Sequence, residues 1–103
     1  MLDAEALKEL EDKYGEIARV RGKGGSWEVV FRPPTQAEYK MFKAHLRDPR
    51  YAPDAQEVLS IQCVVYPSKE EYAALLKKKP AVPEACSEAF MDLVGLNVEA
   101  TGK

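Results

Sequence analysis

Proline residues divide the last two-thirds of this chain into short segments. They stand at Pro33, Pro34, Pro49, Pro53, Pro67, Pro80 and Pro83. Proline lacks a backbone amide proton and clashes with the preceding turn, so it ends a helix or occupies its first turn. The spacing therefore predicts four short helices. They cover approximately residues 35–47, 54–65, 68–78 and 83–94.

Helix-capping residues support these boundaries. Thr35 with Glu38 and Ser68 with Glu71 have the spacing of a capping box, in which each side chain bonds the backbone amide of the other residue. Asp54 is placed to cap the helix between them. Apolar residues recur within each segment at helical spacing. Both signals indicate that this part of the chain is helical.

The first third of the chain combines a helix with a β-hairpin. Asp3 is placed to cap a helix over residues 3–14, whose apolar stripe is narrow. The Gly-Lys-Gly-Gly sequence at 22–25 predicts a turn between two short strands, and hence a hairpin at about residues 16–32. Alternate residues from Trp27 to Phe31 make one face of its second strand apolar. A two-stranded hairpin is marginal alone in water, so this face must pack on helices or on a partner.

These elements predict an α+β, mostly helical fold, in which one N-terminal β-hairpin (about 16–32) precedes a compact bundle of about four helices. A length of 103 residues suits one domain. We expect that domain to span residues 1–96 and residues 97–103 to be a flexible C-terminal tail. Five side chains are expected to be largely buried: Ile61, Val65, Leu75, Phe90 and Leu93.

The charge balance argues against several classes of function. Fifteen Lys and Arg oppose seventeen Asp and Glu, for a formal net charge of -2, whereas nonspecific nucleic-acid binding needs a cationic face. The lysine run at 77–79 lies at a predicted helix C-terminus, where it opposes the helix dipole. No apolar run approaches the roughly 20 residues that cross a bilayer, and the acidic start has no secretion signal. We expect a cytoplasmic protein that binds neither nucleic acid nor membrane.

No pattern typical of an active site or a metal centre occurs in the sequence. Cys63 and Cys86 are far apart without a Cys-x-x-Cys motif, and His45 is the only histidine. We interpret the two thiols as reduced side chains packed as small apolar groups. The clustered carboxylates fit helix caps and solvated helix faces. No catalytic residue, cofactor or metal is predicted.

A series of short motifs runs along residues 26–96. They are Trp27-Glu-Val-Val-Phe-Arg-Pro-Pro-Thr, then Glu38-Tyr39 and Phe42, then Cys63-Val-Val-Tyr-Pro-Ser, then Leu75-Leu76, Pro80 and a helix ending at Leu93-Val94-Gly95. In their order they correspond to an aromatic strand, a helix, a break before the next helix and a closing helix. This order resembles that of the small tail assembly chaperones of long-tailed bacteriophages or prophages.

The resemblance implies a non-catalytic protein of the host cell cytoplasm that binds the tape-measure protein and keeps this long, apolar, helical chain soluble during tail assembly. By their apolarity alone, Trp27, Phe31, Tyr39 and Phe42 are the residues expected to contact this client, another phage tail protein or a second copy in a homo-oligomer. We expect the Trp27 ring to pack with one edge on the 35–47 helix and to meet a neighbouring molecule with the other.

Two alternative functions stay open. A small structural subunit of the virion, such as a connector or decoration protein, would remain in purified particles, whereas a chaperone would be absent from them. A small enzyme is the third hypothesis, which a bound metal or the turnover of a substrate would support.

Overall fold

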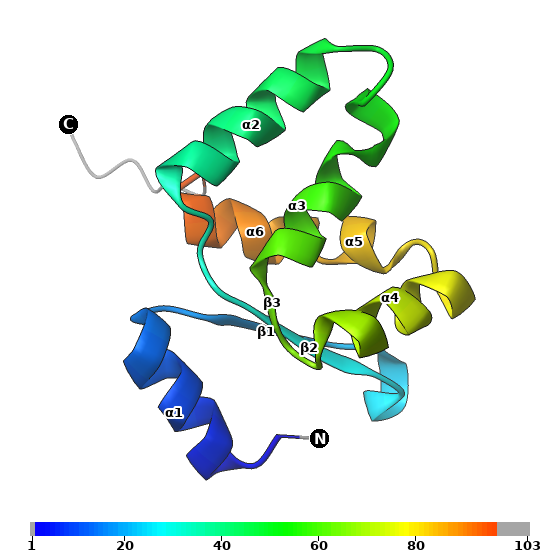
Figure 1. Cartoon of the computed structure of the whole chain (residues 1–103). Helices are drawn as coiled ribbons and strands as arrows, with labels where there is room; N and C mark the ends of the chain where they lie inside the picture. The colour runs from blue at the N-terminus through cyan, green and yellow to red at the C-terminus, as the bar shows by residue number, and fades with distance from the viewer. Residues whose placement is uncertain (1, 97–103) are drawn as a thin grey trace, which may run out of the picture.

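A small antiparallel sheet lies between the N-terminal helix and all the other helices (Figure 1). The computed structural model describes residues 2–96, so the tail expected at 97–103 lies outside the described residues. Within residues 2–96 the fold is α+β and mostly helical, as predicted. In chain order the elements are α1 (Ala4–Tyr14), β1 (Ala18–Arg21), the 3-10 helix η1 (Lys23–Gly25), β2 (Glu28–Phe31), α2 (Gln36–Arg47), the 3-10 helix η2 (Ala52–Asp54), α3 (Ala55–Cys63), β3 (Val64–Tyr66), α4 (Lys69–Lys78), α5 (Val82–Ala85) and α6 (Ser87–Val94).

The two predicted capping boxes are formed, at the starts of α2 and α4. Thr35 Oγ1 accepts a hydrogen bond from the Glu38 amide at 3.1 Å, and Glu38 Oε1 accepts one from the Thr35 amide at 2.8 Å. Ser68 and Glu71 repeat this reciprocal pattern. Asp3 caps α1 by accepting from the amide three residues later. The boundaries predicted for α1, α2 and α4 are confirmed to within one residue.

The segment after α3 is a strand and not the end of a helix. Val64–Tyr66 forms β3, which pairs antiparallel with β2 so that Val30 lies opposite Tyr66. The hairpin predicted over 16–32 is therefore part of a three-stranded sheet of order β1-β2-β3. The helix predicted over 54–65 extended two residues too far at its C-terminal end. Consecutive valines and a tyrosine favour a strand, although their apolar run also fits a helical stripe.

Two further details of the predicted helices are wrong. The helix expected over 83–94 is interrupted at Cys86, whose φ of -91° and ψ of 1° leave the helical region, so α5 and α6 are separate helices. Asp54 makes no side-chain capping bond, because η2 leads directly into α3. None of the helices in the described part of the chain is long and apolar enough to cross a lipid bilayer.

Both faces of β2 are buried, and this burial explains the layers of the fold. Every residue from Glu28 to Phe31 is at most 6% exposed. Val29 and Phe31 point into the core that α2 to α6 form. Val30 and Glu28 occupy the opposite face, which α1 covers. The compact bundle of about four helices is thus corrected to a sheet with five helices on one face and one on the other (Figure 1).

The side chains expected in the core are buried to different degrees. Phe90 is only 5% exposed, as predicted. Ile61, Leu75 and Leu93 are half-buried and pack against the core, and Val65 is half-buried in β3. The centre of the core is formed instead by side chains of the sheet and of α4, of which Phe31 and Tyr72 are completely buried. The prediction of a core formed mainly between helices was therefore only partly correct.

Candidate protein-binding groove

An apolar groove of about 210 Å³ runs between α2, α3 and α6. Its lining consists of Tyr39, Phe42, Gln56, Leu59, Ser87, Phe90, Met91, Val94 and Leu96. None of these lining residues is charged. The volume lies below the roughly 300–1,000 Å³ of typical small-molecule sites. The groove is therefore better suited to the side chains of a bound polypeptide segment than to a whole small molecule.

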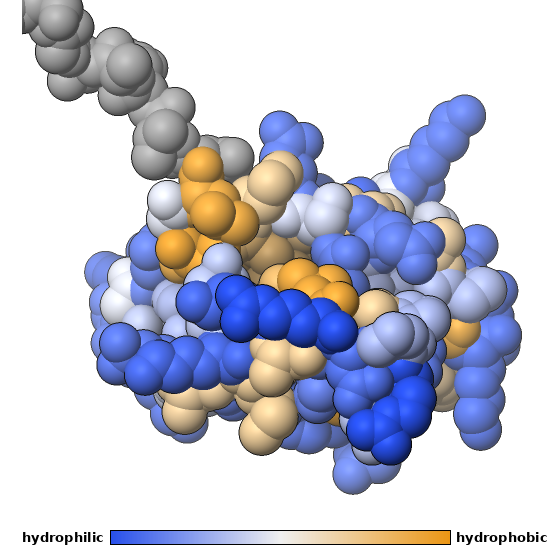
Figure 2. All heavy atoms as spheres, turned by 90° about the horizontal axis from the view of Figure 1, so that it is seen from above, coloured by the Kyte–Doolittle hydropathy of each residue, from blue (hydrophilic) through white to orange (hydrophobic). Residues whose placement is uncertain are grey.

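Two helices provide the walls of the groove. On α2, the rings of Tyr39 and Phe42 lie with their centroids 6.1 Å apart, and helical spacing places Leu46 on the same side. On α6, Phe90 forms the floor, and Met91 lies at the rim. Leu46 is 51% exposed and Met91 39% exposed. The view in Figure 2 shows apolar surface open to solvent beside elongated hydrophilic side chains.

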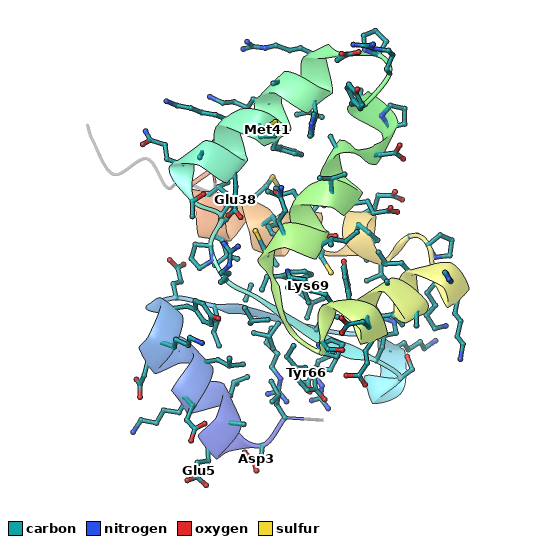
Figure 3. All side chains as sticks on the ribbon, viewed as in Figure 1. Asp3, Glu5, Glu38, Met41, Tyr66 and Lys69 are labelled. Carbon is teal, nitrogen blue, oxygen red and sulfur yellow. The ribbon has the colours of Figure 1, made fainter. Side chains whose placement is uncertain are left out.

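An ion pair holds the α2 wall in place. Arg32, which follows β2, donates to both carboxylate oxygens of Glu38 at 2.8 and 2.9 Å, and also to the carbonyl oxygen of Gln62 at the end of α3 at 2.9 Å. Glu38 lies in the first turn of α2 and points back toward the sheet (Figure 3). The hydrogen bonds from Arg32 lower the pKa of Glu38 to about 2, so the carboxylate is ionised at neutral pH. The pair therefore fixes α2 relative to both β2 and α3.

The groove includes two of the four residues that the sequence analysis proposed for partner contact. Tyr39 and Phe42 line it, one helical turn apart on α2. Phe31 lies in the core with no exposed surface, so its assignment to a contact surface is wrong. The apolar strand face that suggested this role is already covered by helices. The other lining residues, which lie on α3, on α6 and at Leu96, were not predicted as contact residues. Met91, an apolar residue directly after the Phe90 stripe, was a signal for an exposed apolar surface.

Trp27 lies apart from this groove. Its half-buried ring packs against the core and borders a separate pocket of about 270 Å³ formed with residues 79–82 and Ala85, between α4 and α5. The expectation that it packs on α2 is therefore wrong. Trp27 precedes β2 and lies beside the connection between α4 and α5. Alternation along a strand does not predict a contact between residues so far apart in the sequence. An exposed edge of the indole remains available beside the α4–α5 connection.

Gly22 is in close contact with the Trp27 ring, and this contact leads to a prediction. A β-carbon at Gly22 would lie 2.3 Å from Trp27 Nε1, well inside van der Waals contact. We expect Gly22→Ala to displace the indole and to move the fluorescence emission of this single tryptophan to longer wavelength, with little change in circular dichroism. Lys23→Ala in the same turn is the matched control and should leave the emission unchanged. The same emission maximum in Gly22→Ala as in the wild type would contradict the ring position.

The two cysteines are buried free thiols, and their burial confirms that they pack as small apolar groups. Burial raises the pKa of Cys63 and of Cys86 to about 11. Because the thiolate is the reactive form, we expect both thiols to react with a soluble disulfide reagent orders of magnitude more slowly in the native protein than in denaturant. Rapid modification of either thiol at neutral pH in the folded protein would show that this burial is wrong. No cluster of three or more His, Cys, Asp or Glu suited to a metal ion occurs within residues 2–96.

A wider groove of about 580 Å³ separates α1 from β1. Its lining mixes apolar residues with Lys8, Glu11 and Arg19. These side chains carry opposite charges, and the first two belong to a surface helix with no buried residue. The α2–α6 groove has the more uniform chemistry, so it is the better candidate for a binding site.

Comparisons with known proteins identify the fold and the family. A solved structure of the uncharacterised protein rbstp2171 from Bacillus stearothermophilus is similar, with a TM-score of 0.72 and 24% sequence identity, over 94% of this chain and 99% of that chain. At this identity the likeness shows the fold alone. A search of curated proteins found no match. The model of one family, described as Domain of unknown function (DUF6848), matches residues 10–103, and the chain therefore belongs to the DUF6848 family.

Proposed function

We propose that this protein is a non-catalytic tail assembly chaperone that binds an apolar helical segment of the phage tape-measure protein and keeps it soluble. The observation that carries the proposal is the α2–α6 groove, whose lining residues within the described chain are uncharged and mostly aromatic or aliphatic. Grooves of this kind accept the apolar face of an amphipathic helix through side chains at i, i+3, i+4 and i+7.

The exposed apolar residues around the groove support a protein partner. Leu46, Met91 and Leu96 are 51%, 39% and 56% exposed. Met91 and Leu96 line the groove, and helical spacing places Leu46 on the side of α2 that carries Tyr39 and Phe42. Burying such side chains in a complex is favourable by about 25 cal/mol per Å² of apolar area removed from water. Methionine adapts its shape to different apolar surfaces. A rim of this composition suits a long client that offers many similar segments.

The motifs that resemble tail assembly chaperones are also the ones that build the groove. Arg32 and Glu38, from the strand end and the following helix cap, hold α2 in position. Tyr39 and Phe42, from the next motif, form its groove-facing side. The resemblance therefore concerns the parts of the chain on which the proposed client site depends.

The test is co-expression with the candidate client. A very long helical reading frame directly downstream of the gene would identify that client, and the wild-type protein should keep it soluble and co-purify with it. Met91→Glu places a charge at the groove rim and should lower the affinity at least about tenfold, since interface anchors contribute about 2 kcal/mol or more. Met41→Glu is the matched control, because Met41 lies on α2, is 52% exposed and does not line the groove.

The outcomes separate the proposal from its alternatives. Unchanged co-purification of Met91→Glu would contradict the groove as the client site. Mass spectrometry of purified particles distinguishes a chaperone, which should be absent, from a connector or decoration subunit, which should be present in stoichiometric amounts.

A further inference from the structure

We propose that the groove selects amphipathic helices with an acidic flank, and that this flank lies along α2. The inference rests on the proposed function and specifies the chemistry of the bound segment. Its basis is the charge at the two sides of the groove, which differs although the groove lining itself is uncharged.

The α2 side is cationic. Lys40, Lys43 and Arg47 are exposed on α2, and none of the three forms an ion pair with another residue of the described chain. The one carboxylate within α2, Glu38, is already paired with Arg32. These three positive charges are therefore available to a partner.

The position of Lys43 ties this charge to the groove. Its Nζ lies 5.1 Å from the ring centroid of Tyr39, which lines the groove. Arg47 follows one helical turn later on the same side of α2 and next to Leu46, the exposed apolar residue of that wall. A helix that inserts apolar side chains beside Tyr39 would thus carry its flanking residues past these cations. Figure 2 shows elongated hydrophilic side chains bordering the apolar surface.

The α6 side offers no such charge, since none of its eight residues is basic. A ligand helix with acidic residues on one flank therefore meets attraction along α2 and none along α6, which favours a single orientation. The protein as a whole has a net charge of -2, but charges separated by more than about 8 Å are largely screened at physiological ionic strength. The local cations therefore decide the selectivity.

The experiment compares three synthetic helical peptides that share one apolar stripe and carry Glu, Gln or Lys on one flank. Binding to the full chain is measured by fluorescence anisotropy at low and at high salt. We expect the Glu peptide to bind about fivefold more tightly than the Gln peptide at low salt, and the Lys peptide more weakly than both, because exposed ion pairs contribute modestly and are screened. High salt should remove the preference.

A matched pair of variants assigns the selectivity to α2. Lys40→Gln/Arg47→Gln should lower the preference for the Glu peptide, because Lys43 alone then remains, and an unchanged preference would overturn the inference. Lys77→Gln/Lys78→Gln is the control, because it also removes two positive charges. The two lysines lie in the last turn of α4 and do not line the groove. Loss of the preference in the control would overturn the inference.

The remaining outcomes distinguish this inference from the proposed function. Equal, salt-independent binding of all three peptides would overturn the charge selectivity and leave the groove as an apolar client site. Failure of all three to bind would contradict the groove itself and thus both proposals. A Glu-rich peptide without the apolar stripe that bound equally well would also overturn the inference, since the attraction would then not involve the groove.

Discussion

Replacing Phe31 by alanine is expected to lower the free energy of unfolding by about 3–5 kcal/mol, a large fraction of the roughly 5–15 kcal/mol by which a domain is stable. The side chain has no exposed surface. Its ring centroid lies 4.6 Å from that of Phe90 and 6.0 Å from that of Tyr72, in a nearly perpendicular arrangement with the latter. Removing the ring leaves a cavity where the sheet, α4 and α6 meet. Urea denaturation followed by circular dichroism measures the loss.

Met41→Ala removes a side chain that is 52% exposed and should change the free energy of unfolding by no more than about 0.5 kcal/mol. The contrary result would be a Phe31→Ala variant that is as stable as the wild type but does not co-purify with the client. It would show that Phe31 contacts the client and is not part of the core.

Helix beginnings were predictable because they depend on residues close together in the chain. A capping box needs only the side chains and amides of four consecutive residues, so Thr35 with Glu38 and Ser68 with Glu71 set the starts of α2 and α4 without help from the rest of the fold. The left-handed Gly95, at φ 85°, ends α6 in the same local way.

The third strand was not predictable from local pattern. Val64 and its neighbours have an apolar sequence that suits a buried helix or a strand, and Pro67 suggested a helix end after them. The edge of β2 decides between the two, since its backbone groups need partners that β3 supplies. That requirement becomes visible only when residues more than 30 positions apart are placed side by side.

Only the α2 wall of the candidate groove was predictable from the sequence. Helical spacing identified Tyr39 and Phe42 as an apolar pair, but the facing wall on α6 depends on how α2, α3 and α6 pack. Apolarity alone could not separate an exposed aromatic residue from a core one, which is why Phe31 was grouped with them. Trp27 was assigned to the wrong neighbour for the same reason.

The sequence analysis gave no role to Glu28. This carboxylate lies on the face of β2 opposite Val29 and Phe31, for which the strand pattern predicted no contact. The antiparallel register places Arg21 directly opposite it, with Arg19 on the same face of β1. Two arginines spaced by two before the glycine turn, with a glutamate after it, were a usable signal. The sequence could not show that α1 would cover this face and make the side chain inaccessible.

Glu28 joins β1 to β2 and ties the start of α1 to the sheet, and replacing it by glutamine should loosen both contacts. The Glu28 side chain is only 1% exposed. Its Oε1 accepts a hydrogen bond from the Leu2 amide at 3.0 Å, Arg19 Nε donates to its Oε2, and Arg21 Nε lies 3.7 Å from the same oxygen. Arg19 and Arg21 belong to β1, so their contacts with Glu28 join β1 to β2. The bond from Leu2 ties the residue just before the Asp3 cap of α1 to the sheet.

The Glu28→Gln substitution is expected to cost about 2 kcal/mol of unfolding free energy. Breaking a fully buried ion pair costs about 3–5 kcal/mol, but the Arg19 side chain is 34% exposed and regains water when its partner is lost. Hydrogen exchange should accelerate in the amides of α1 and stay unchanged in α4. Glu16→Gln, an equal charge change at an exposed position near the same segment, should have neither effect.

The loss of unfolding free energy caused by Glu28→Gln should depend on pH, in a direction that the pKa of Glu28 sets. Burial alone raises this pKa, but the hydrogen bonds from Leu2 and Arg19 and the charges of Arg19 and Arg21 outweigh burial and hold it below the ordinary value of 4.5. A carboxylate with a lowered pKa in the folded state stabilises the protein above its unfolded pKa, and this stabilisation is lost as the pH falls through the folded pKa. The difference in stability between wild type and Glu28→Gln should therefore be full at neutral pH and shrink below about pH 4. A difference that stayed constant into acid would show that the charge of the carboxylate is not what stabilises its contacts with β1 and with Leu2.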